Sequence, residues 1–178
     1  MDDATAATIE QAKRGDRAAL ARLLTSLQDS WFRFCLSLLR DADLARDATQ
    51  ETALRFLRQL NRFRGESSLK TWSLSVAVNV VSEMKRDRRP SSGADPPELA
   101  SDRCSEDFDA LETAESKQLL FAQLDQLPDR QRQALVLRFF EELTIQQTAS
   151  VMGCAIGTVK ATVHQALRTL RTKMTQLK

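Results

Sequence analysis

Apolar residues recur every three or four positions along most of this chain, and this pattern constrains the fold more strongly than any other. Near the C-terminus, Ile156, Val159, Val163, Leu167 and Leu170 follow this spacing. Residues so spaced lie on one face of an α-helix. Strand-like alternation is hard to find, and the 178 residues include only five glycines and four prolines. The sequence therefore predicts an all-α fold.

One stretch interrupts the helical pattern. Residues 90–107, PSSGADPPELASDRCSED, lack apolar periodicity and are rich in Pro, Ser and acidic residues, a composition typical of a flexible linker. A chain of this length suits one ordinary domain or two small ones, and this stretch favours two. We therefore expect two small helical domains, residues 1–90 and 108–178, joined by a flexible acidic linker over 91–107.

Charge is unevenly distributed, although the net charge is only +2. From Arg62 to Arg89, seven Lys or Arg stand against three Asp or Glu. From Ile156 to the end there are five Lys or Arg and no acidic residue. Between these blocks, Pro90 to Glu115 holds eight acidic residues and one Arg. Two basic blocks thus flank an acidic one, and basic surfaces attract nucleic acid.

Local signals place the helices of the first domain. Residues 5–27 read as one or two short helices with a break at Gly15, and Asp29 or Ser30 can cap a second helix over 29–40. A long helix over 44–63 follows. Ser67 can cap a helix that runs from 69 to Pro90, which stops it. We expect Trp31 and Trp72 in the core, with a base contact as the alternative for Trp72.

The second domain carries a helix-turn-helix pattern. We expect helices over 108–127 and 129–140, a short helix that Thr144 can cap, and the closing helix. A small residue at Ala149 and a turn glycine at Gly153 are typical of the motif, in which the second helix enters the major groove of DNA. The alternative is that an exposed helix end is simply basic, because cations suit a helix C-terminus.

Two longer segments resemble a known family. Residues 124–171, LDQLPDRQRQALVLRFFEELTIQQTASVMGCAIGTVKATVHQALRTLR, resemble region 4 of bacterial sigma factors of the extracytoplasmic-function (ECF) group. Residues 41–89, DADLARDATQETALRFLRQLNRFRGESSLKTWSLSVAVNVVSEMKRDRR, resemble region 2 of the same group. The resemblance implies a factor without catalysis of its own that binds core RNA polymerase and directs promoter recognition and melting.

The resemblance also implies roles for particular residues. The family's D-x-x-Q-E segment, which docks on core RNA polymerase, reads Asp47, Gln50 and Glu51 here, and Leu54 lies on the same side of the helix. The alternative for this face is a solvated surface with local salt bridges to Arg55 and Arg58.

The family's minus-ten element is read by a loop that captures a flipped base and by the helix after it. The matching residues here are Arg64, Gly65, Glu66, Ser67, Ser68, Lys70, Asn79, Lys85 and Arg86. Arg88 and Arg89 could also hold phosphates. An ordinary capped turn is the alternative for the loop.

The family's minus-thirty-five element is read by the closing helix. The matching residues are Thr158, Lys160, Ala161, Thr162, His164, Gln165 and Arg168. Thr162 and Gln165 replace two arginines of the common family pattern, so binding to phosphate is expected to be weaker or differently specific. Gln165 could instead read adenine through its amide.

The implied partners are core RNA polymerase, promoter DNA and an anti-sigma factor. We expect a cytoplasmic protein without membrane insertion, because no signal peptide or spanning segment is visible. The cysteines Cys35, Cys104 and Cys154 match no metal spacing, and we expect no metal, cofactor or catalytic residue.

Two other classes of protein are alternatives to a sigma factor. A stand-alone helix-turn-helix regulator would bind a palindromic site as a dimer, without polymerase. An enzyme would need a nucleophile and base, a metal cluster or a phosphate loop, and the sequence shows none of these signatures.

Overall fold

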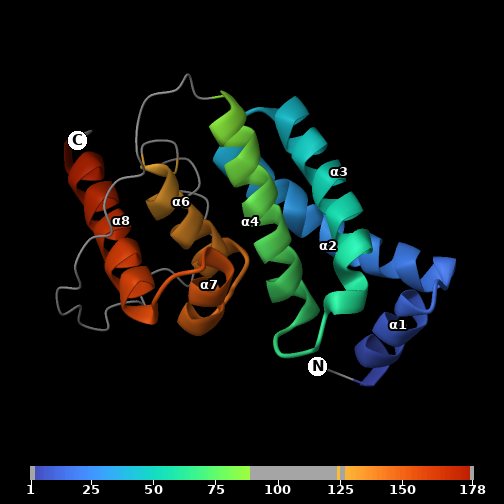
Figure 1. Ribbon diagram of the computed structural model, residues 1–178. Coiled ribbons are helices and arrows are strands. Elements are labelled where there is room, and N and C mark those ends of the chain that lie inside the picture. The colour runs from blue at the N-terminus through green and yellow to red at the C-terminus, as the bar shows by residue number, and fades with distance from the viewer. Residues whose placement is uncertain (1–2, 89–123, 125–126, 177–178) are drawn as a thin grey trace. The chain divides into compact units, whose positions relative to one another are not determined.

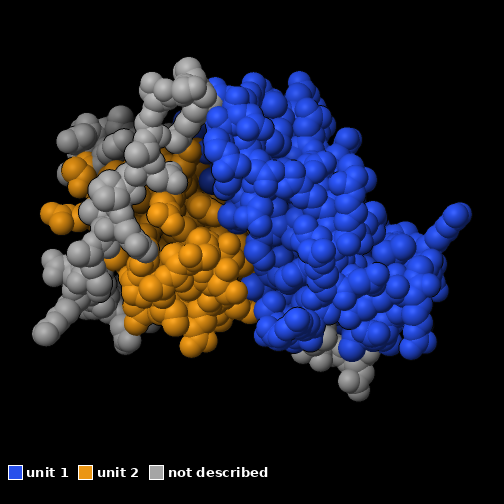
Figure 2. All heavy atoms as spheres, in the orientation of Figure 1, with its two compact units in different colours: residues 1–90 blue, residues 91–178 orange. Residues whose placement is uncertain are grey.

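The structure, a computed structural model, describes residues 3–88, 124 and 127–176 (Figure 1). Every regular element in these ranges is helical, which confirms the all-α prediction. The chain divides into two compact units, residues 1–90 and 91–178, coloured separately in Figure 2. The segment predicted as a linker, and most of the helix predicted over 108–127, lie outside the described residues.

The first unit is a bundle in which α2 contacts α1, α3 and α4, and α3 also packs on α4. Its elements are α1 (Asp3–Lys13), α2 (Arg17–Leu39), α3 (Ala42–Gln59), the short 3-10 turn η1 (Leu60–Arg62) and α4 (Leu69–Arg88). The breaks predicted at Gly15 and near residue 41 are present, and α4 matches the predicted helix within a residue.

The predicted break at Asp29 and Ser30 was wrong, because α2 runs unbroken through both residues. Its N-cap is Asp16, whose carboxylate accepts a hydrogen bond from the Ala19 N–H at 2.9 Å. Apolar packing on one face is continuous through Leu27 and Trp31, and both side chains are buried. A side chain that can cap a helix does so only where the helix begins, and here packing carries the helix onward.

A row of aromatic rings forms the centre of this unit. Trp31 and Phe56 have ring centroids 5.3 Å apart, Phe56 and Trp72 5.5 Å, and Phe63 and Trp72 5.3 Å. The indole N–H of the fully buried Trp31 donates to Ser73 Oγ at 3.0 Å. Trp31 is thus confirmed as a core residue. Trp72 packs against two of these rings, in partial agreement with the prediction of a core residue, because its side chain is half-buried rather than buried.

The second unit contains α6 (Asp129–Leu135), the π-helical segment η4 (Val136–Phe140), α7 (Ile145–Met152) and α8 (Ile156–Gln176). Helix α8 contacts both α6 and α7. The helix predicted over 129–140 is present, but its second half is π-helical. There the Glu141 N–H reaches the Val136 carbonyl at 3.0 Å, five residues back.

The turn before α7 is set by a capping box. Thr144 Oγ1 accepts from the Gln147 N–H at 3.2 Å, and Gln147 Oε1 accepts from the Thr144 N–H at 2.8 Å. Thr144 is therefore confirmed as a cap, and the reciprocal bonds satisfy two N–H groups that the first turn leaves open.

Candidate nucleic-acid and protein interfaces

The predicted polymerase-binding residues lie on one side of α3. Asp47, Gln50 and Leu54 are exposed, and Glu51 is half-buried. Asp41 begins the helix by accepting hydrogen bonds from the N–H groups of the next helical turn, at 2.9 and 3.0 Å. The opposite side of α3 is buried against the bundle. The four predicted side chains thus share a surface that the bundle leaves open.

This α3 surface includes a residue that the sequence interpretation missed. Leu57 is 36% exposed and Leu54 is 49% exposed, and they are two of the three exposed large hydrophobic residues in the described part of the chain. Their spacing of three residues places them side by side on a helix. The signal was available, because an apolar residue three positions after Leu54 extends the same face.

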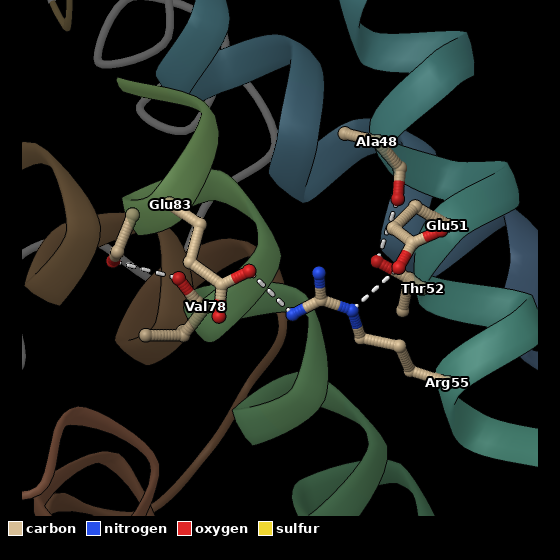
Figure 3. A network of polar contacts seen from close by, with 7 residues as sticks. Ala48, Glu51, Thr52, Arg55, Val78 and Glu83 are labelled. Carbon is tan, nitrogen blue, oxygen red and sulfur yellow. Dashed lines mark hydrogen bonds and ion pairs between the residues drawn. The ribbon is translucent and has the colours of Figure 1, made fainter. Parts of the chain in front are cut away.

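Glu51 is engaged by a cation of its own helix. Arg55 Nε donates to Glu51 Oε1 at 2.6 Å, and Arg55 Nη1 lies 2.6 Å from Glu83 Oε2 on α4 (Figure 3). The hydrogen bond to Glu51, and next the one to Glu83, raise the pKa of Arg55. The local salt bridge considered as an alternative for this face therefore exists at Glu51, and it extends to a second helix.

The loop predicted to read the minus-ten element is held at both ends. At its start, Lys13 of α1 donates to the Phe63 carbonyl at 3.0 Å, and its ammonium lies 6.0 Å from the centre of the Phe63 ring. At its end, Ser68 Oγ accepts from the Thr71 N–H at 3.1 Å. The predicted cap Ser67 was wrong by one residue, because its hydroxyl bonds the Ser68 carbonyl at 3.4 Å instead.

Between these anchors the loop exposes its tip. Arg64, Gly65 and Glu66 are exposed, as is Ser68, whereas Ser67 is half-buried. Gly65 has a φ of 77°, in the left-handed region that favours glycine. The sequence interpretation could not find the role of Lys13, since this contact joins residues fifty positions apart.

The candidate DNA residues of α4 do not all share one side. Asn79 and Arg86 are exposed, and a spacing of seven residues places them on one face. Lys70 is half-buried and, nine residues before Asn79, lies about half a helical circumference away from it. Lys85 is half-buried near the C-terminal end, and Arg89 lies outside the described residues.

Helix α8 buries one side and presents the other. Val159, Val163, Ala166 and Leu170 are all buried. Facing away from them are Ala161, His164, Gln165 and Arg168, and the last three are exposed. Thr158, Lys160 and Thr162 are half-buried on the flanks of this surface. All seven predicted residues therefore border one continuous face.

Ile156 departs from the predicted apolar stripe of this helix. Its side chain is 46% exposed at the first position of α8, and Leu167 is only half-buried. The turn before it is tight. Gly153 has a φ of 61°, and the Cys154 N–H reaches the Ala149 carbonyl at 3.1 Å. This turn ends α7 as glycine commonly does and leaves Ile156 at the rim of the unit.

Within the described ranges, no group of three His, Cys, Asp or Glu residues could hold a metal ion. Cys35 is fully buried, and burial raises the pKa of its thiol to about 12. Cys154 is half-buried, and Cys104 lies outside the described residues. The helices that the structure describes are all too short or too polar to span a membrane.

Comparison with known families matches both units. Residues 23–90 match the family described as Sigma-70 region 2, and residues 117–170 match the one described as Sigma-70, region 4. The two matches together cover more than half of the chain. Helix α1, which holds the start of the 64–68 loop, lies before the first match.

Known proteins agree with these matches. The RNA polymerase sigma-H factor of Pseudomonas aeruginosa is 31% identical over 168 residues, covering 89% of this chain and 87% of that protein. The ECF RNA polymerase sigma factor SigW of Bacillus subtilis is 24% identical over 179 residues, covering 95% of this chain and 96% of that protein. The sigma factor RpoE from Bartonella quintana, solved in complex with the anti-sigma factor NepR, has a similar fold. Its TM-score is 0.66 at 24% identity, covering 87% of this chain and 96% of that one.

The chain therefore belongs to the sigma-70 family of transcription initiation factors, in the ECF group. Membership supports the sigma-factor interpretation of the sequence over that of a stand-alone helix-turn-helix regulator.

Proposed function

We propose that this chain binds core RNA polymerase through the α3 surface of its first unit, formed by Asp47, Gln50, Glu51, Leu54 and Leu57. The observation that carries the proposal is the exposure of two leucines among polar residues on this surface. Exposed apolar side chains rimmed by polar groups are typical of protein interaction sites. The region 2 match includes this helix.

The loop and α4 read the minus-ten element. The exposed tip Arg64–Glu66 lies between two anchored ends, which suits a rim against which an extruded base can be held. Asn79 and Arg86 share a face on which the amide can bond a base and the guanidinium a phosphate. Lys70 and Lys85 contribute charge from other sides of the helix rather than a single contact surface.

Helix α8 reads the minus-thirty-five element in the major groove. Its face of Ala161, His164, Gln165 and Arg168 lies opposite the core, as a recognition helix requires. Gln165 is suited to bond adenine, and Arg168 is suited to a phosphate. The half-buried Thr158, Lys160 and Thr162 border the same groove.

The protein does no chemistry of its own and acts in the cytoplasm, where core polymerase and promoter DNA are found. An anti-sigma factor controls it by occupying surfaces that polymerase needs. A solved structure of similar fold holds such a partner, and the exposed leucines of α3 are available to one here.

Run-off transcription tests the proposal. Core polymerase free of sigma factors is mixed with the chain and sheared DNA from the source bacterium, and RNA starts are sequenced. We expect discrete starts that share a two-part upstream motif and that are lost with Asp47→Ala plus Gln50→Ala. The exposed pair Gln28→Ala plus Asp29→Ala on α2 removes the same residue types and should leave the starts intact.

Two results together would refute the proposal. One is the absence of starts that depend on the chain, and the other is tight binding of a palindromic DNA without polymerase. That combination would indicate a regulator that binds DNA as a dimer.

A further inference from the structure

Arg55 connects the candidate polymerase surface with the helix that carries candidate DNA contacts. Its guanidinium lies between two carboxylates from different helices, Glu51 on α3 and Glu83 on α4, each at 2.6 Å (Figure 3). The Arg55 side chain is 28% exposed, and those of Glu51 and Glu83 are 38% and 40% exposed. The cluster is thus partly shielded from water and open to a partner.

The geometry makes Arg55 a support for Glu51. A free glutamate samples many rotamers, and a partner that binds it must restrict them at an entropic cost. Here the carboxylate is already held by Arg55, which in turn is held by α4. One cation between two carboxylates also leaves the cluster negatively charged, so a basic group of a partner is still attracted.

The anchor on α4 is placed between residues with a predicted role. Glu83 follows Asn79 by four residues and precedes Arg86 by three, a spacing that puts all three on one side of the helix. Arg55 therefore ties the α3 surface to the same side of α4 that is proposed to meet DNA.

We propose that Arg55 is a positioning residue for polymerase binding: it fixes the Glu51 carboxylate in the orientation that core RNA polymerase accepts, and Glu83 holds it in place. This inference rests on the proposed function of the α3 surface. Lysine cannot replace Arg55, because an ammonium is a point charge, whereas the planar guanidinium presents separate donors to two carboxylates.

The test measures the dissociation constant of core RNA polymerase for the full chain and its variants. Glu51→Ala removes the contact, and Glu83→Ala removes only the anchor on the other helix. Arg55→Lys keeps the positive charge but removes the planar guanidinium that donates to both carboxylates. We expect Glu83→Ala and Arg55→Lys each to weaken binding by about threefold to tenfold, the range expected when one side chain must be immobilised on binding.

The decisive comparison is made in the background of Glu51→Ala. There Glu83→Ala and Arg55→Lys should cause no further loss, because the carboxylate that they position is absent. Asp87→Ala is the matched control, since it removes an exposed carboxylate four residues further along α4. It should leave the affinity unchanged.

Other outcomes would overturn the inference. If the Glu83→Ala loss is the same with and without Glu51, Arg55 does not act through Glu51. If Glu83→Ala has no effect on a chain that binds polymerase, the positioning role fails while the proposed function stands. If the unaltered chain does not bind core polymerase, the proposed function fails and the inference with it. Tryptophan fluorescence during unfolding separates these results from a loss of fold, because Trp31 and Trp72 both lie in this unit.

Discussion

Replacing Arg132 should destabilise the second unit and leave the first unchanged. Arg132 is only 3% exposed. Its Nε donates to the Leu124 carbonyl at 2.8 Å, and its Nη2 donates to the Leu127 carbonyl at 2.7 Å. Asp129 lies 3.6 Å from its Nη1, but that carboxylate is 44% exposed. The guanidinium thus joins the segment before Pro128 to α6.

The magnitude follows from these contacts. Hydrogen bonds from a charged donor contribute about 1.5–3 kcal/mol each, so two contribute about 3–6 kcal/mol. The exposed Asp129 pair adds under about 1 kcal/mol. Arg132→Met removes the bonds but also the cost of burying a charge, and the Leu124 carbonyl keeps its bond from the Leu127 N–H at 3.1 Å. We therefore expect a loss near the lower bound, about 3 kcal/mol.

The assay uses the position of the tryptophans. Trp31 and Trp72 report only on the first unit, whereas circular dichroism reports on helices of both. A loss of this size lowers the melting midpoint of a small domain by more than about 10 °C. Arg132→Met should therefore give an early transition in circular dichroism and an unchanged one in tryptophan fluorescence. Arg130→Met, an exposed neighbour on the same helix, is the control. If Arg132→Met and Arg130→Met unfold at the same temperature by circular dichroism, Arg132 does not stabilise the second unit as argued.

The remaining predictions concern the buried thiol of Cys35 and the recognition helix α8. In a variant that keeps Cys35 as its only cysteine, the Cys35 thiol of the folded chain should be labelled at pH 8 at least about 100-fold more slowly than that of the chain unfolded in urea. The reagent reaches this thiol only when the helices around it open. Because burial raises the pKa of this thiol from 9.0 to about 12, its contribution to the free energy of unfolding is fully present below a pH of about 9 and is lost as the pH rises toward 12. Free energies of unfolding from urea titrations at several pH values would measure this loss. On promoter DNA, Gln165→Ala should relax base preference at one position at a cost of about 1–3 kcal/mol. Arg168→Ala should weaken all sequences alike and reduce the salt dependence by about one ion. Binding measured against a panel of single-base changes separates the two.

Helices could be predicted from the sequence where packing and local signals agree. The stripe Val159, Val163 and Leu170 is buried as its spacing indicates. Thr144 caps α7 because a glutamine three residues on completes the capping box. The predicted helix start at Asp29 or Ser30 was wrong, because both residue types suit a cap but the apolar face of α2 continues past them. The unbroken spacing of Leu23, Leu27 and Trp31 was the signal for one long helix.

Contacts between distant residues could not be predicted in this way. Periodicity relates residues within a helix, so the bond from Arg55 to Glu51 follows from a spacing of four. The bond from Arg55 to Glu83 depends on how α3 and α4 pack, and the one from Lys13 to Phe63 depends on where α1 docks. Periodicity also failed to show that Ile156, at the first position of α8, is exposed although it follows the spacing of the buried residues.

The same contacts explain how weak interactions can matter for binding. A pair as exposed as Arg55 and Glu51 adds little to the free energy of unfolding, typically under about 1 kcal/mol. Its contribution to the free energy of binding is of similar size, because it restricts the Glu51 side chain before the partner arrives. The loop over 64–68 is restricted before binding in the same way. The contacts of Lys13 at one end and Ser68 at the other hold its ends, so only its tip must adjust to a partner. The chain thus places its candidate contacts on helices and on one short anchored loop, so the cost of ordering them is met largely on folding rather than on binding.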